Sequence, residues 1–489
     1  MPQGIREMLF QNGAMLSSDI AERLDAEGVT PEAIRKRISR AGPPVSRLKG
    51  VNFPNKEAFL FIDGDFGTPD FKSHLEEALI KTGTSYGRAL LGIAARHGAV
   101  CERDLPAATG LPVRPTKRQI LCSAAIEKLK QLGLLIPEAG TEQVVFATYG
   151  SPGMTPRLRA IRVAEDIMLM ATRSWLVRAG FSSTNVVSVR IDGRTPLTGP
   201  YGWDLCCPTY LSGIATRTSS TVRPGSLVCD VILGRHLAIN DLKPFIAKCD
   251  SLIHQRRESR LQPMIIADSF ERAALDMLRT RGTFIARPEA ILGADTARDL
   301  RQLIDTIANA AMSVTSSPDK VFELVGRMSR LEGAALNLRA VVLELIMAHL
   351  YKEDGLFIEI RKKIRDSKGQ TAEIDIMASS HSNIYFCECK GMAPGSLVNR
   401  DTIDTWESKK LPRIKEWFKT SPYRDHRAEF RFYASTGYAD EALMLIADLA
   451  LKHRKQPISF LNGVDILGTL EKRRESALID VFNEQFVVR

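Results

Sequence analysis

The stretch that decides the fold of the last third of the chain is TAEIDIMASSHSNIYFCECKG, residues 371–391. Its first half alternates, so that Ile374 and Ile376 share one face of a strand and Glu373 and Asp375 share the other. A polar turn, SSHSN, separates this strand from a second apolar run, IYFCECK. The pattern predicts a β-hairpin.

Three charged side chains meet where the predicted hairpin ends. Glu388 and Lys390 share a face of the second strand, and the hairpin brings them beside Asp375. Two carboxylates can hold a hard divalent cation, while a neighbouring ammonium can act on a phosphate or on water. The alternative is an ordinary hairpin with a surface Glu and Lys, but charges at the end of an apolar strand are costly to desolvate unless something binds them.

These residues resemble the PD-(D/E)xK nuclease superfamily, which has the restriction-endonuclease-like fold. The family places an acidic residue at the end of one strand and the D/E-x-K motif on the next, as in Asp375 followed by Glu388-Cys389-Lys390. The Pro that sometimes precedes the first Asp is replaced here by Ile374. The resemblance covers about the last third of the chain.

The resemblance implies a metal-dependent phosphodiesterase site. Mg²⁺ or Mn²⁺ would be held by Asp375, Glu388 and the main-chain carbonyl of Cys389. Glu344, on a helix upstream, would complete the shell directly or through water. Lys390 would orient or deprotonate the attacking water and stabilise charge on the phosphoryl oxygens.

Composition limits the class of protein. The 489 residues are 44% hydrophobic and 25% charged, as in a globular chain long enough for three or four domains. A net charge of +10 favours a polyanionic partner. The N-terminus has no signal-peptide pattern, no run is long enough to span a membrane, and eight cysteines lie without metal-ligand spacing. We therefore expect a cytoplasmic protein.

Residues 1–65 predict a winged helix-turn-helix module. Thr30 and Pro31 begin a helix, PEAIRKRISRA, and residues 45–50 and 57–62 can pair as a wing. A basic second helix followed by a basic wing is typical of modules that lie against DNA. The alternative is a charged, solvated face on a small helical domain. The candidate DNA-binding residues are Arg35, Lys36, Arg37, Arg40, Arg47 and Lys49.

Residues 66–155 predict a second winged-helix-like domain. Its third helix, over residues 116–132, is less basic than the helix of the first module, and a hairpin wing follows it. A packing or dimerisation role is therefore as well supported as DNA reading.

The rest of the chain contains the same order of elements twice, in residues 156–313 and 314–489. Each part predicts a helix, three strands, then helix, strand, helix and strand. We expect the first to be a degenerate nuclease-like α/β domain, although an unrelated α/β domain has a similar order. At the positions of Asp375, Glu388 and Lys390 it has Asp204, Asp230 and Ile232.

A predicted helix over residues 404–419 follows the D/E-x-K strand and is rich in bases. Lys409 and Lys410 on this helix could hold DNA phosphates, or they could lie on a solvated face.

Together these patterns predict a multidomain α/β and α+β protein: tandem winged helices, a degenerate nuclease-like domain and an active one. The leading hypothesis is a Mg²⁺-dependent deoxyribonuclease in restriction, in antiviral or other defence against foreign DNA, or in mobile-element processing. The alternatives are a non-enzymatic DNA-binding assembly factor and a nuclease effector activated by a partner or ligand. A homodimer and a partner protein both stay open, and no membrane is expected.

Overall fold

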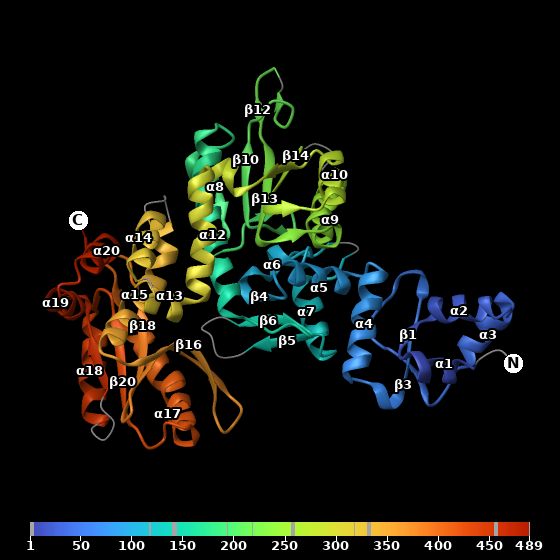
Figure 1. Ribbon diagram of the computed structural model, residues 1–489. Coiled ribbons are helices and arrows are strands. Elements are labelled where there is room, and N and C mark those ends of the chain that lie inside the picture. The colour runs from blue at the N-terminus through green and yellow to red at the C-terminus, as the bar shows by residue number, and fades with distance from the viewer. Residues whose placement is uncertain are drawn as a thin grey trace.

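The computed structural model describes residues 4–116, 119–138, 144–192, 194–217, 219–255, 260–316, 318–329, 334–453 and 458–488. The predicted helix over residues 116–132 includes residues 117 and 118, which lie outside this part of the chain. The molecule is elongated, with the first helices at one end and the last sheet at the other (Figure 1). Helices and several separate sheets make it a multidomain mixed α/β protein.

The first sheet has the strand order β1-β3-β2 and packs with three helices around one core. Pro31 occupies the first turn of the basic helix and Thr30 precedes it in extended conformation, as predicted. The predicted wing is present as the antiparallel pair of β2 and β3. The elements are α1 (Ile5–Asn12), β1 (Met15–Leu16), α2 (Ser17–Ala26), α3 (Pro31–Arg40), β2 (Val45–Arg47) and β3 (Phe59–Ile62).

A helix that sequence reasoning missed, α4 (Pro69–Lys81), connects this sheet to the next. Thr68 caps it by accepting a hydrogen bond from the backbone of Phe71. The second sheet, β4-β6-β5, shares its core with α4. Its elements are α5 (Ser85–Ala95), β4 (Ala99–Cys101), α6 (Leu105–Ala108), α7 (Cys122–Gln131), β5 (Leu135–Glu138) and β6 (Val145–Thr148).

The middle of the chain forms a five-stranded sheet with the order β15-β14-β13-β10-β7. Strands β7, β10 and β13 are antiparallel neighbours, whereas β13, β14 and β15 run parallel. Two short ribbons, β8 (Leu197–Thr198) with β9 (Tyr201–Gly202) and β11 (Thr216–Arg217) with β12 (Val222–Arg223), lie beside it. The main elements are α8 (Pro156–Arg178), β7 (Ser188–Val189), β10 (Leu205–Thr209), β13 (Gly225–Leu237), α9 (Ile239–Gln255), β14 (Leu261–Phe270), α10 (Arg272–Thr280) and β15 (Phe284–Ala286).

The C-terminal part forms a second five-stranded sheet, β16-β17-β18-β20-β22, with the same pattern of directions. Its first three strands are antiparallel, and β18, β20 and β22 are parallel. A short ribbon of β19 (Leu397–Val398) and β21 (Gly437–Tyr438) accompanies it. The main elements are α15 (Ala334–Glu353), β16 (Phe357–Arg365), β17 (Thr371–Ser379), β18 (Asn383–Lys390), α16 (Arg400–Thr405), α17 (Leu411–Thr420), β20 (Arg427–Ala434), α18 (Asp440–Lys452) and β22 (Ile458–Leu461).

Helices α8 and α15 join the two five-stranded sheets through one large apolar core. Residues 314–330, which the sequence predicts to begin as a Ser- and Pro-bearing connector and then become helical, are helical over Pro318–Ser329. The apolar residues Val321, Leu324 and Val325 of this helix are buried in the shared core. Sequence reasoning also missed the last two helices of the chain. The additional helices are α11 (Pro288–Leu292), α12 (Ala294–Ala308), α13 (Ala310–Ser316), α14 (Pro318–Ser329), α19 (Gly463–Arg473) and α20 (Ser476–Phe486).

The alternation predicted for β17 breaks down at Asp375. Ile376 packs in the core that contains α15, whereas Ile374 packs in the core that contains α17. The two were expected on one face, and that prediction is wrong. The change of face coincides with Arg361 on the neighbouring strand, whose φ of 54° lies in the left-handed region. The strand is therefore irregular at the residue that carries the proposed site.

Candidate active site

The predicted hairpin exists and brings its two carboxylates together. The backbone pairs Ile376 with Cys387, so Asp375 and Glu388 are the next residues along each strand. The backbone N–H of Cys389 donates to Asp375 Oδ2 over 2.8 Å, which fixes that carboxylate at the sheet's end. Both acidic side chains are buried. The carbonyl of Cys389 stays a predicted ligand.

Two lysines reach this acidic pair from different elements. Lys390, at the end of β18, places its Nζ 3.0 Å from Glu388 Oε1. Lys410 was predicted to hold DNA phosphates or to lie in solvent, but its Nζ lies 3.1 Å from Asp375 Oδ1 and 2.5 Å from Glu388 Oε2. Lys409, beside it in sequence, is exposed as predicted. The site thus contains a lysine that sequence reasoning had assigned to another role.

Sequence reasoning misplaced Lys410 because it treated residues 404–419 as one regular helix. The structure divides this segment into α16, a π-helical turn over Trp406–Lys410, and α17. The wider turn changes the direction of the side chains that follow it. The signal in the sequence was Pro412, since a proline in a helix interior disrupts the regular hydrogen bonding.

The pKa values of the two carboxylates shift in opposite directions. Burial alone would raise the pKa of Asp375, but Lys410, Lys390 and the N–H of Cys389 hold it below its usual value. The pKa of Glu388 is raised, first by burial and then by the negative charge of Asp375. The pKa of Lys410 is raised, because the attraction of the two carboxylates exceeds the opposing effect of burial.

Glu344 lies on α15 beside the acidic pair, but its carboxylate is already occupied. Arg361 Nε and Nη2 donate to its two oxygens over 2.6 and 2.8 Å. Arg361 makes these two hydrogen bonds with its backbone in the left-handed region. The structure therefore places Glu344 next to the pair as an anchor for Arg361, and its predicted role as a metal ligand stays a prediction.

The acidic pair fits a hexacoordinate divalent cation that keeps several waters. One oxygen of Asp375 and one of Glu388 already converge on a single cation, the ammonium of Lys410. Within the described part of the chain, no cluster of three or more His, Cys, Asp or Glu side chains could enclose a metal. Mg²⁺ is commonly bound by one or two carboxylates together with water and substrate phosphate, so two are sufficient.

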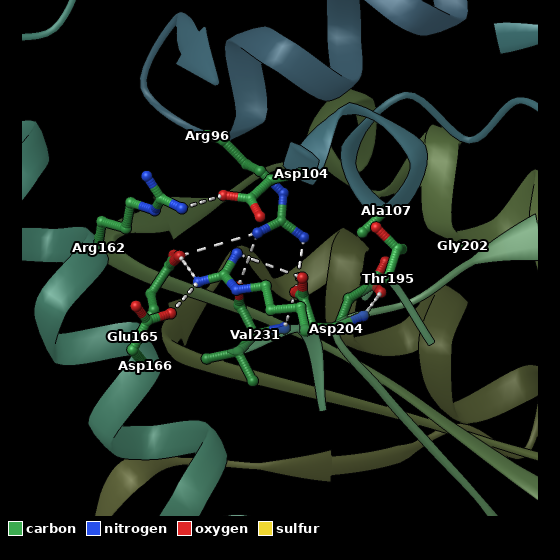
Figure 2. A network of polar contacts seen from close by, with 12 residues as sticks. Arg96, Asp104, Ala107, Arg162, Glu165, Asp166, Thr195, Gly202, Asp204 and Val231 are labelled. Atoms are coloured by element: carbon green, nitrogen blue, oxygen red, sulfur yellow. Dashed lines mark hydrogen bonds and ion pairs between the residues drawn. The ribbon is translucent and has the colours of Figure 1, made fainter. Parts of the chain in front are cut away.

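The middle sheet carries a matching set of side chains (Figure 2). Leu205 pairs with Cys229 there, as Ile376 pairs with Cys387, so Asp204 and Asp230 follow in the same register as Asp375 and Glu388. The N–H of Val231 donates to Asp204 Oδ2 over 2.9 Å. The same hydrogen bond links Cys389 to Asp375.

The remaining members of the set also recur. Arg190 Nη2 lies 2.9 Å from Glu165 on α8, as Arg361 binds Glu344 on α15. Lys248, on the helix after β13, lies 2.7 Å from Asp230, as Lys410 meets Glu388. Sequence reasoning missed Arg190 and Lys248. The strand lysine alone lacks a counterpart, since Ile232 holds its register position, as the sequence indicated.

A residue from outside the middle sheet closes its acidic set (Figure 2). Arg96, which follows α5, places Nη2 2.6 Å from Asp204 Oδ2 and Nη1 3.3 Å from the carbonyl of Val231. The next residue, His97, contacts the carbonyl of Leu233 over 2.7 Å. The side chain of Asp204 is fully buried as a result. No opening to solvent remains at this carboxylate.

Lys248 is closed off in the same way. Its Nζ donates to the carbonyls of Ala107 and Gly202 over 2.9 and 3.0 Å and lies 4.0 Å from the centre of the Trp203 ring. Its side chain is fully buried, whereas Lys390 and Lys410 are 18% and 21% exposed. In the middle set (Glu165, Arg190, Asp204, Asp230 and Lys248), Asp204 and Lys248 are therefore fully buried. In the C-terminal set (Glu344, Arg361, Asp375, Glu388, Lys390 and Lys410), the two lysines are partly exposed.

The basic residues of the first module lie mostly where the sequence predicts them. Arg35, Lys36, Arg37 and Arg40 are exposed on α3, and Lys49 is exposed beyond β2. Arg47 is exposed too, but its Nη2 donates to the carbonyls of Ile38 and Ser39 over 2.6 and 3.4 Å. This guanidinium binds the C-terminal end of α3.

Comparisons with known proteins add little to this geometry. No family model matches the chain, and no curated protein matches it. The crystal structure of AF1548, a protein of unknown function, matches 28% of this chain and 78% of its own at 14% identity, with a TM-score of 0.20. The restriction endonuclease FokI bound to DNA matches 95% of this chain and 80% of its own at 11% identity, with a TM-score of 0.18. Likenesses this weak carry no argument.

No helix in the described residues is long and apolar enough to cross a membrane. All eight cysteines are buried and free of disulfides, and they pack as small core residues.

Proposed function

We propose that the chain is a metal-dependent deoxyribonuclease whose C-terminal α/β unit hydrolyses phosphodiester bonds. The observation that carries the proposal is the convergence of Asp375 and Glu388 on the ammonium of Lys410 at the end of a sheet, with Lys390 beside them. An anchored pair of carboxylates with a neighbouring lysine is suited to a divalent cation and a phosphate, and its partial exposure leaves a route for both.

In the proposed reaction, Asp375 and Glu388 would hold Mg²⁺ or Mn²⁺, and the bound metal would supply Lewis acidity at the phosphoryl group. Lys390 orients the attacking water and stabilises negative charge on the phosphoryl oxygens. Water adds to phosphorus, and the bond from phosphorus to one ester oxygen breaks. The products are a phosphate monoester and a free hydroxyl, with the oxygen and both protons supplied by the water.

In this proposal the other parts of the chain position DNA. The first unit, residues 1–65, acts as a winged helix that lays the exposed bases of α3 against the phosphate backbone. Residues 66–155 act as a second winged-helix-like unit. Residues 156–313 are a degenerate copy of the nuclease unit, residues 314–489. Because α3 and β18, the strand that carries Glu388, lie toward opposite ends of the molecule (Figure 1), docking and cutting would occur at separate places on the duplex.

Plasmid cleavage tests this function. The purified full-length protein with Mg²⁺ or Mn²⁺ is expected to nick or linearise supercoiled DNA, and EDTA is expected to stop it. Asp375→Asn and Lys390→Met should each lower the rate by about 100-fold or more, the usual cost of losing a group that stabilises a transition state. Lys419→Met, an exposed lysine of α17 in a surface pair with Glu416, is the matched control and should cleave normally.

Two outcomes oppose the proposal. Undiminished cleavage by both Asp375→Asn and Lys390→Met would place the chemistry elsewhere. Salt-sensitive DNA binding without cleavage in either metal would favour the non-enzymatic assembly factor instead.

A further inference from the structure

The π-helical turn before α17 determines where Lys410 lies. The turn spans Trp406–Lys410, and Pro412 follows within the first turn of α17. In a regular α-helix the ring of Pro412 would collide with the carbonyl of Ser408, four residues earlier, and would leave that carbonyl without an N–H partner. A π-helical turn accommodates this defect, and such turns are frequent at functional sites.

From this turn, Lys410 forms ion pairs with both carboxylates. Its ammonium lies between Asp375 Oδ1 and Glu388 Oε2, whereas Lys390 approaches the other oxygen of Glu388. Two buried carboxylates this close repel each other, so a positive charge between them is needed to keep both ionised. Lys410 thus supplies the charge that a divalent cation supplies in the proposed reaction.

The middle sheet shows independently that this helix lysine is part of the shared arrangement. Lys248, on the helix that follows β13, meets Asp230 as Lys410 meets Glu388. Lys248 is also held by two backbone carbonyls and is fully buried, so it has no room to move. Lys410 is 21% exposed. Of the two helix lysines, it alone borders solvent.

We propose that Lys410 is a second catalytic lysine that occupies two positions in turn. It bridges Asp375 and Glu388 until a divalent cation takes their oxygens, and it then contacts a non-bridging oxygen of the scissile phosphate. Two cations cannot share the same oxygens without strong repulsion, and the flexible four-carbon stem of lysine keeps the displaced ammonium within reach of the substrate. This assignment rests on the proposed nuclease function.

Two measurements on the full-length protein test the exchange. Mn²⁺ affinity is measured by isothermal titration calorimetry without DNA, and the rate of plasmid cleavage is measured with Mn²⁺ at saturation. Lys410→Met should bind Mn²⁺ about tenfold more tightly or better, because the competing ammonium is gone, a change of about 1.4 kcal/mol. The same variant should cleave about 100-fold more slowly, because the phosphate loses one charge partner. A merely structural lysine would not move the two readouts in opposite directions.

Lys419→Met is the matched control from the same helix and should leave both values unchanged. If Lys410→Met does not fold, Lys410→Gln, which can still donate hydrogen bonds to the carboxylates, replaces it. Mn²⁺ affinity that stays equal or falls in the Lys410 variant would overturn the proposal, as would wild-type cleavage. If the wild type cleaves no nucleic acid while the variant binds Mn²⁺ more tightly, the cation exchange is supported and the nuclease function fails.

Discussion

The two five-stranded sheets carry the same acidic framework but differ in what completes it. In the middle sheet, Arg96 from the preceding unit forms an ion pair with Asp204, whose side chain is fully buried. In the C-terminal sheet the corresponding carboxylate, Asp375, meets the ammonium of Lys410 at a partly exposed position. The same arrangement of carboxylates can therefore hold two parts of a protein together when its positively charged partners are arginine and lysine side chains.

The ion pairs of the middle set stabilise its buried acids. A buried carboxylate without a partner is strongly destabilising, so Asp204 and Asp230 depend on Arg96, Arg190 and Lys248. Burial would raise the pKa of Asp204, but Arg96 and Arg190 hold it below its usual value. These acids thus act as structural charges in the middle sheet.

The largest expected effect comes from removing the residue that closes the middle set. Arg96→Met leaves Asp204 with less compensation in a fully buried position, and should lower the free energy of unfolding by about 3 to 5 kcal/mol. Thermal unfolding of the full-length protein measures this change. Arg279→Met, which removes a 69% exposed guanidinium in a surface pair, should cost less than about 1 kcal/mol.

A double variant separates lost charge balance from lost packing. Arg96→Met combined with Asp204→Asn removes both charges, so part of the stability lost in Arg96→Met should return. An Arg96→Met protein that unfolds at the wild-type temperature would show that this contact does not close the middle set.

The second effect asks whether the missing strand lysine can be restored. Ile232 is buried in an apolar core with Trp203 and Phe245, so Ile232→Lys should destabilise the chain by about 3 kcal/mol. Denaturant unfolding measures the loss. Because Arg96 and Lys248 still occupy the acids, the variant should bind no additional Mn²⁺. A second equivalent of Mn²⁺ in calorimetry would mean that the middle set differs from the C-terminal one by this lysine alone.

The third effect is the stabilisation that metal itself provides. A ligand that binds only the folded state at 100 times its Kd stabilises by about 2.7 kcal/mol, so Mn²⁺ should raise the unfolding temperature of the wild type. The increment should vanish in Glu388→Gln and persist in Asp230→Asn, whose position in the middle set is sealed. An increment lost equally in both variants would contradict the assignment of the metal to the C-terminal sheet.

Much of this comparison was accessible from the sequence, because local patterns decide strands and caps. The hairpin around Asp375, the Thr30-Pro31 start of α3 and the repeated order of elements follow from alternation and turn chemistry. The correspondence of Asp204 and Asp230 to Asp375 and Glu388 followed from the repeated order of elements, and the strand registers agree with it.

Contacts distant in the sequence could not be read in the same way. Arg96 lies 108 residues before Asp204, and Lys248 is 141 residues from its carbonyl partner in Ala107. No local pattern distinguishes these bases from exposed ones. Lys410 was misplaced for a related reason, because the π-helical turn that directs it was treated as regular helix.

The smallest expected effect concerns Glu165 and Glu344, the acids that lie beside the two pairs of carboxylates. Glu165→Gln should cost more stability than Glu344→Gln, because Arg190 is 4% exposed and Arg361 is 22% exposed and can regain water. We expect about 1.5 kcal/mol for Glu344→Gln, the lower end of the usual cost of a lost hydrogen bond to a charged group. Thermal unfolding of the two variants compares them. Calorimetry then decides the role of Glu344: if it only anchors Arg361, Mn²⁺ affinity should fall much less in Glu344→Gln than in Glu388→Gln. A loss as complete as that of Glu388→Gln would instead make Glu344 a ligand, as the sequence alone predicted, and would require Arg361 to release it when the metal binds.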